Sequence, residues 1–235
     1  MKAFGSILAV FVAFALGAQA QVTIDWDFSG GGGSGAPNPT LPPNISGGTL
    51  FGTNEYPGNN PGFNSANQSG GYPGASGNHN ASIAIQSGSL DPLASTYFEF
   101  ALTPASGYQL TATDLQFGTF SKGNGPQTIT LLASVDGFTT FTTLGSATGL
   151  PTTSTWTLVA LSSFSFSAAA DVPITFRLYG SDGIGGSVSS NWRIDDVSLS
   201  ITATAVPEPS TFMALLVGGA VLGVRAWRRR KPAVG

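Results

Sequence analysis

Carboxylates are the main titratable groups that could carry out chemistry in this chain of 235 residues. Two pairs of them are close together in the sequence, Asp25 with Asp27 near the start and Asp195 with Asp196 near the end. Carboxylate oxygens are the ligands that calcium prefers, and two facing carboxylates are what glycoside hydrolysis requires. The chain has no cysteine and one histidine, which excludes thiolate metal sites, cysteine nucleophiles and histidine clusters.

The other acids do not form an evident catalytic pair. Asp91, Asp136, Asp171 and Asp182 stand beside turns, where hydrogen bonds from the side chain to the backbone already explain them. Glu99 lies on a predicted strand and is a candidate acid, but the sequence shows no partner for it. No lysine follows a glycine-rich turn, which excludes a P-loop. We therefore predict that the protein is not an enzyme.

Charge is distributed unevenly along the chain. Residues 21–206 carry eleven acidic and three basic side chains, a net charge of −8, whereas the last 29 residues carry one acidic and five basic side chains, a net charge of +4. An acidic body is not attracted to phosphates, so nucleic acid is excluded as a partner. The basic end is typical of the cytoplasmic flank of a membrane segment.

Residues 1–20 are typical of a secretory signal peptide. Lys2 supplies the positive start, Ile7–Leu16 is an apolar stretch of the expected length, and Ala18-Gln19-Ala20 matches the small-x-small cleavage pattern. The alternative is a permanent N-terminal anchor, for which the apolar stretch is too short. We expect the mature chain to begin at Gln21.

The C-terminal segment, residues 206–231, has three parts in a fixed order. It begins with Pro207, Glu208 and Pro209, continues with the uncharged stretch Thr211–Val224, and ends with a basic cluster of Arg225, Arg228, Arg229, Arg230 and Lys231. The 14 uncharged residues span ~21 Å as a helix, which approaches the thickness of a bilayer core if Arg225 extends toward the interface. The alternative is a buried helix of the soluble domain, which is excluded because five basic residues follow at once. A helix with that ending would be an amphipathic surface helix, whereas this stretch is apolar all round. We predict a transmembrane helix at about 211–227 and a basic cytoplasmic tail.

This tripartite order resembles the PEP-CTERM sorting signal of exported bacterial proteins. The resemblance implies that an exosortase-like enzyme, embedded in the inner membrane, recognises the motif, cuts near it and passes the protein outward. It implies export across the inner membrane, transient anchoring by the C-terminal helix, and then a location on the cell surface or outside the cell. The resemblance covers the tail and leaves the role of the preceding residues open.

Residues 21–205 predict an all-β domain. Apolar residues alternate with polar ones, as in Phe98 and Phe100 or in Ile174, Phe176 and Leu178, which is typical of half-buried strands. Turn signals separate about nine or ten such strands, and no helical periodicity occurs among them. This pattern favours a β-sandwich, specifically a jelly roll. Within the domain, residues 29–80 are rich in Gly, Asn, Pro and Ser and predict one long flexible loop.

Four aromatic residues recur along this loop: Phe51, Tyr56, Phe63 and Tyr72. Aromatic rings at such positions either stack on the sugar rings of a ligand or tie the loop to the sheet. The sequence leaves both interpretations open.

The last predicted strand, Asn191–Thr202, has a break in its pattern. The apolar phase slips by one residue across Asp195 and Asp196, which predicts a bulge or a position buried from both sides. The run from Trp192 to Ser200 resembles the closing strand of jelly rolls of the carbohydrate-binding-module type.

That second resemblance implies a structural calcium ion, held by an aspartate of the last strand and by acids near the first strand. The candidate ligands are Asp25, Asp27, Asp195 and Asp196. The alternative is that the last two carboxylates pair with an arginine, Arg193 or Arg177, or with amides at strand ends. The ligand spacing matches no dedicated calcium-binding loop.

Two functions remain after these exclusions. The first is a non-catalytic surface or extracellular-matrix protein, which requires nothing beyond export and a stable sandwich. The second is a module that binds extracellular polysaccharide, which the sandwich and its aromatic residues allow.

Overall fold

The computed structural model describes residues 20–28, 39–53, 62–65, 69–77, 79–184 and 190–206, together with Gly218 and Leu222. Residues 1–19 of the predicted signal peptide, the sorting tripeptide, the basic cluster and nearly all of the predicted transmembrane segment lie outside these residues. Within the described part of the chain, no helix has the length and apolar character needed to cross a membrane.

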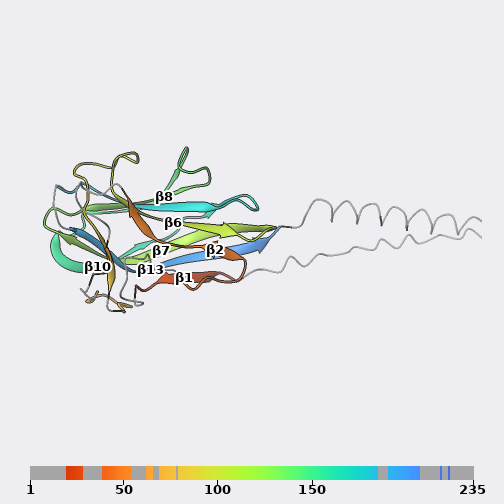
Figure 1. Ribbon diagram of the computed structural model, residues 1–235, viewed down its shortest axis with the longest axis horizontal. Helices are drawn as coiled ribbons and strands as arrows, with labels where there is room; N and C mark the ends of the chain where they lie inside the picture. Colours follow the sequence, from red (N-terminus) through yellow and green to blue (C-terminus); the bar gives the residue numbers. More distant parts are fainter. Residues whose placement is uncertain are drawn as a thin grey trace, which may run out of the picture.

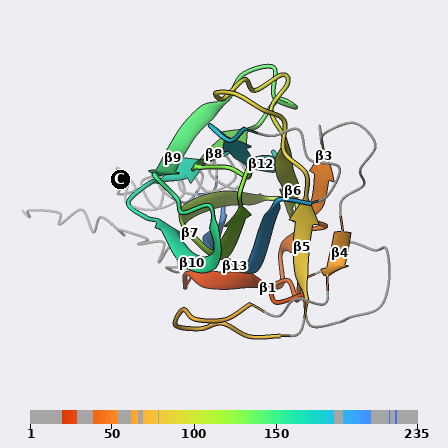
Figure 2. The same cartoon turned by 90° about the vertical axis from the view of Figure 1, so that its left-hand side faces the viewer.

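The described residues form thirteen strands in two antiparallel sheets (Figures 1 and 2). The first sheet has the order β10 (Thr153–Leu161), β7 (Tyr108–Lys122), β13 (Trp192–Ala205), β5 (Asn80–Ile83) and β4 (Gly62–Ser65), with β1 (Val22–Trp26) beside β13 and β11 (Phe166–Ser167) beside β7. The second sheet has the order β2 (Ile45–Gly47), β6 (Tyr97–Pro104), β12 (Ile174–Ser181), β8 (Thr128–Ser134) and β9 (Thr142–Thr148), with β3 (Phe51–Thr53) beside β6. The all-β prediction is confirmed.

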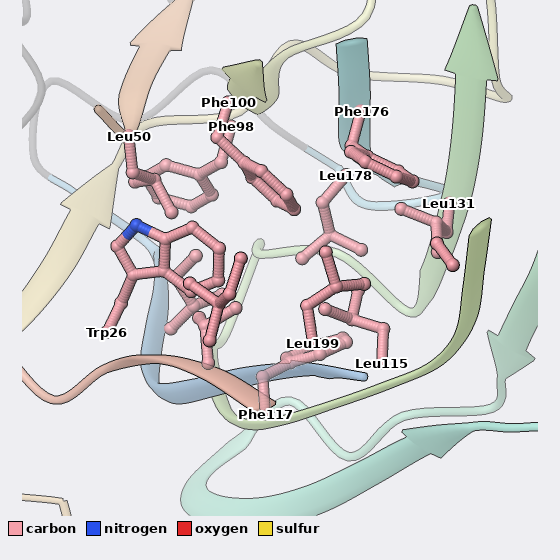
Figure 3. Packing of buried hydrophobic residues seen from close by; sticks show 14 of the residues in the cluster. Trp26, Leu50, Phe98, Phe100, Leu115, Phe117, Leu131, Phe176, Leu178 and Leu199 are labelled. Carbon is pink, nitrogen blue, oxygen red and sulfur yellow. The ribbon is translucent and has the colours of Figure 1, made fainter. Parts of the chain in front are cut away.

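The inner faces of the two sheets share one hydrophobic core (Figure 3). Leu115, Phe117 and Leu199 of the first sheet pack with side chains of the second sheet that include Phe98, Phe100, Leu131, Phe176 and Leu178. The predicted alternation is therefore correct: on β6, Phe98, Phe100 and Leu102 are buried in this core. Burial of each large apolar side chain contributes about 1.5–3 kcal/mol before entropy is counted.

Trp26 connects β1 to the second sheet. Its ring lies 4.7 Å from that of Phe100, and its indole N–H donates a hydrogen bond of 2.7 Å to the carbonyl of Gly48. Gly48 belongs to the segment between β2 and β3, and its amide also donates a hydrogen bond of 2.8 Å to the carbonyl of Ala101, so both of its backbone groups hold this segment over the core.

Residues 29–80 contain more structure than the predicted loop. Strands β2, β3 and β4 lie within them, and Leu50 is completely buried. The sequence does not reveal these strands, because they are only three or four residues long and need glycine where two backbone segments approach closely. A Cβ on Gly47, whose φ is +94°, would collide with the carbonyl oxygen of Ala101. The sequence also gives no signal for β9, because this edge strand has no apolar alternation.

The loop aromatics have different surroundings. Tyr72 contacts the first sheet, as described below, so for this residue the tying role is confirmed. Phe51 is 41% exposed on the edge strand β3. Tyr56 and the side chain of Phe63 lie outside the described residues.

The predicted bulge in the last strand is confirmed. The register of β13 on β7 pairs Asp195 with Gly118 and Ser198 with Gln116, so that β13 contains one extra residue between these pairs. Asp196 has a φ of +47°, in the left-handed region that non-glycine residues seldom adopt. In a strand without a bulge, the side chains of Asp195 and Asp196 would lie on opposite faces of the sheet. The bulge lets both carboxylates lie on the same face.

Candidate functional site

The segment of residues 69–77 is held against β13 by the carboxylate of Asp196. Its Oδ2 accepts hydrogen bonds from the Tyr72 hydroxyl at 2.5 Å, from the Ser69 hydroxyl at 3.2 Å and from the Ser76 amide at 3.1 Å. Its Oδ1 accepts a further bond of 2.5 Å from the Ser76 hydroxyl. We call Ser69, Tyr72, Ser76 and Asp196 the hydroxyl clamp.

Tyr72 lies directly on the backbone of β7 within this clamp. A Cβ on Gly118 would collide with the Tyr72 hydroxyl, so glycine is required beneath the ring. The Tyr72 ring is also 6.3 Å from that of Trp156 on β10, which in turn is 5.5 Å from Phe120. Burial and the hydrogen bond to Asp196 raise the pKa of Tyr72 above its ordinary value, so the phenol stays protonated and remains a donor.

Asp195 is completely buried beside the clamp. Its Oδ1 accepts a bond of 2.9 Å from the Asp196 amide, while its Oδ2 is buried without a hydrogen bond of normal geometry from the described residues. Burial raises the pKa of Asp195 to about 7, and the negative charges of Asp196 and Asp27 contribute in the same direction. The nearby Ser69 hydroxyl opposes this shift in part.

A pocket of about 280 Å³ opens next to the clamp on the first sheet. Its lining combines three carboxylates with amide and hydroxyl groups, and the lining residues are Asp25, Trp26, Asp27, Gly74, Ser76, Gln116, Asp196 and Ser198. The fold therefore brings three of the four acids singled out in the sequence to one pocket, and it buries the fourth, Asp195, beside them.

These residues do not fit a calcium site. Among the described residues, no three acidic or histidine side chains are arranged so that they could hold a metal ion. The oxygens of Asp196, the central acid, already accept four hydrogen bonds from the clamp. Three hydroxyl donors and one loop amide thus occupy the positions around Asp196 that a cation would need.

A second cluster lies on the outer face of the second sheet. The guanidinium of Arg177 on β12 is 4.3 Å from the centre of the Tyr97 ring and 3.8 Å from that of Phe138, and it donates a bond of 2.5 Å to Glu99. Tyr179 accepts a bond of 3.3 Å from Arg177 and donates one of 3.0 Å to the carbonyl of Pro92. We call Tyr97, Glu99, Phe138, Arg177 and Tyr179 the arginine–aromatic cluster.

Sequence reasoning missed this cluster and left Glu99 without a partner. The sequence does indicate part of it: Tyr97 and Glu99 are two residues apart and therefore lie on the same face of their strand, and the same holds for Arg177 and Tyr179. The register that sets Arg177 directly opposite Glu99 is a property of the folded sheet.

The predicted sorting residues Pro207, Glu208 and Pro209 and the basic cluster lie outside the described residues. The structure describes the chain up to Val206, whose amide donates a bond of 2.7 Å to the carbonyl of Gly107. Hydrogen bonding of the folded body therefore continues to the residue that precedes Pro207.

Residues 205–231 match the family model of the PEP-CTERM protein-sorting motif. The sequence-based recognition of the tail is confirmed: the chain carries the signal of an exported protein that is handled by a C-terminal sorting system. The match begins at Ala205, the last residue of β13, and does not extend into the rest of the sandwich.

Three of the solved structures that are similar to this chain are compared with it by identity, coverage and TM-score. One is a family 29 carbohydrate-binding module, at 13% identity over 80% of this chain and 91% of that one, with a TM-score of 0.37. The K1 cleaved adhesin domain of Lys-gingipain from Porphyromonas gingivalis W83 is 15% identical over 76% of this chain and 97% of that one, with a TM-score of 0.37. A family 11 carbohydrate-binding module from Clostridium thermocellum is 10% identical over 79% and 98%, with a TM-score of 0.31. At these values the similarity assigns no function to the sandwich. No curated protein matches the chain.

Proposed function

We propose that this protein is a non-catalytic β-sandwich that works on the cell surface or in the extracellular matrix after C-terminal processing. The observation that carries the proposal is the PEP-CTERM motif, which begins at the last residue of the final strand. In this proposal residues 1–20 are removed on export, residues 21–205 form the body as a jelly roll, and residues 206–231 form the sorting tail.

The tail acts in two steps in this proposal. The helix at about 211–227 holds the body outside the inner membrane, with the basic residues retained in the cytoplasm. Pro207 and Pro209 keep the residues around Glu208 extended, because proline fits neither a helix interior nor a central strand. A membrane-embedded, exosortase-like enzyme then cuts near this segment and releases the body outward.

The experiment is mass spectrometry of the protein from its own host. We expect the mature species to lack the basic cluster, and we expect Glu208→Ala to accumulate as a longer, membrane-bound form. A main species that still ends at Gly235 would contradict the proposal, since the tail would then be a permanent anchor.

The surroundings of the acids support a non-catalytic role. Glu99 is paired with Arg177, and Asp196 is engaged by the hydroxyl clamp. Asp136 accepts hydrogen bonds from the amide and hydroxyl of Thr140 and from the Ser134 hydroxyl, and these bonds lower its pKa. A general acid requires a carboxyl with a raised pKa that is open to substrate. Asp195 has the raised pKa, but it is completely buried.

A second candidate is binding of extracellular polysaccharide, which the pocket on the first sheet favours. It combines carboxylate, amide and hydroxyl groups, and the half-buried rings of Tyr72 and Trp156 lie on the same sheet. Sugars bind to such combinations of hydrogen-bonding groups and aromatic surface.

A glycan array with the mature protein tests this candidate. We expect Gln116→Ala and Trp156→Ala to abolish any binding that the wild type shows. Phe141→Ala is the matched control, because Phe141 is an exposed aromatic residue between β8 and β9 of the second sheet, whereas the pocket lies on the first sheet. Binding that survives both changes would exclude the pocket and the neighbouring aromatic rings as the site.

A further inference from the structure

Among the described residues, the end of β13 is paired on one side only. Its register with β7 continues to Ala205, which lies opposite Tyr108, whereas its register with β1 ends where Ile201 lies opposite Val22. Ala20 and Gln21, the described residues that precede Val22, do not belong to the strand. Figure 1 shows β13 continuing beside β7 past β1.

The direction of the backbone groups at this end follows from one hydrogen bond. The Val206 amide points toward β7, where it donates to Gly107. Because the N–H and C=O groups of successive residues alternate between the two edges of a strand, those of Ala203 and Ala205 point to the opposite edge. That edge presents two donors and two acceptors on residues with small side chains, which allow another strand to approach closely.

We propose that this edge, residues 202–206, is a docking strand for the processing enzyme, which adds an extended segment of its own to β13 while it engages the sorting motif. The proposal rests on the proposed function. The position of the motif selects this occupant: the match begins at Ala205, so the edge and the motif are one continuous stretch of chain. An enzyme that holds the residues beyond Val206 therefore meets the edge of β13 next to them.

Pairing by strand addition explains how a motif can be processed although no linker separates it from a folded body. The residues on the body side of Pro207 are held by β7 and cannot be drawn out as a free peptide. They are already extended, however, and strand addition uses an extended edge as it stands. The body thus supplies half of the surface that the enzyme recognises.

Full-length variants in the native host test the proposal, with the rate of conversion to the mature form followed by pulse-chase. Ala205→Pro, at an exposed position, removes an N–H from the open edge and leaves the bonds to β7 in place. Loss of one such bond is expected to slow processing about tenfold. Ala205→Ser, which keeps the N–H group, is expected to be processed at the wild-type rate. The melting temperature of each purified protein shows whether the body is folded.

An insertion of Gly-Ser-Gly-Ser between Val206 and Pro207 tests the same point without touching the sandwich. We expect it to slow processing, because it separates the motif from the edge. Wild-type rates in this insertion variant, or in folded Ala205→Pro, would overturn the proposal. So would a dimer of the wild type that Ala205→Pro dissociates at unchanged processing, since the occupant would then be a second copy. Glu208→Ala separates the two proposals. If this variant is processed normally, the proposed function fails. If it is blocked while Ala205→Pro and the insertion variant are processed at the wild-type rate, only the docking edge fails.

Discussion

Asp195 is expected to make the protein less stable as the pH rises from about 4 to about 7. Its pKa is about 7 in the folded state against 3.8 for an ordinary aspartate, so between these values the folded chain binds a proton that the unfolded chain has lost. Stability falls with pH wherever the folded state binds more protons. Above pH 7 the carboxylate is charged in both states, and the cost of burying that charge is fully present.

The size of the effect follows from the shift. At about 1.4 kcal/mol per pKa unit, a shift of about three units corresponds to a ceiling of about 4 kcal/mol. Local relaxation around a buried charge reduces this cost, so we expect about 2 kcal/mol. The change Asp195→Asn keeps the shape of the side chain and removes the charge. Between pH 4.5 and pH 8, the free energy of unfolding should fall by about 2 kcal/mol less in the variant than in the wild type. The variant should therefore be more stable than the wild type at pH 8.

Urea unfolding at a series of pH values measures this, with fluorescence of the buried residues Trp26 and Trp192 as the signal. Asp27→Asn is the matched control, because it removes a neighbouring charge from an exposed position and should change the slope far less. If wild type and Asp195→Asn show parallel curves, the carboxyl is not the buried acid that the structure describes and the reasoning is refuted.

Three further predictions concern the clamp, the cluster and calcium. Gly118→Ala should destabilise the protein by about 1–3 kcal/mol in urea unfolding, because the new methyl group displaces Tyr72. Gly145→Ala on β9 is the control, because its methyl group would make only ordinary contacts with Leu161. Glu99→Gln should cost about 1 kcal/mol, since it leaves the partly buried Arg177 without its charged partner; an unchanged unfolding midpoint would show that the pair contributes nothing. Added calcium should leave the melting temperature of the chelated protein unchanged, and a rise that depends on Asp196 would restore the metal site that the geometry argues against.

The sequence by itself determined which residues face the core and where the last strand is irregular. Period-two alternation is a local property, so Phe98, Phe100 and Phe176 could be assigned to a buried face before any partner strand was known. The slip at Asp195 and Asp196 is equally local, because one extra residue reverses the alternation wherever the strand is placed. The sorting tail is a linear signal whose parts are read in order along the chain, and it needed no fold to be recognised.

Tertiary structure decided which groups meet. Alternation assigns a face but not a register, so only the folded sheet could set Arg177 opposite Glu99. The partners of Asp196 lie some 120 residues away in a segment whose composition predicts a loop, and their arrangement depends on the bulge together with the space above Gly118. The short strands of residues 45–65 are held by close backbone approach and by cross-strand pairing, which leave little apolar pattern in the sequence. The open edge at Ala205 follows from strand lengths: β7 accompanies β13 to its end and β1 does not, and no residue type in the sequence encodes that difference.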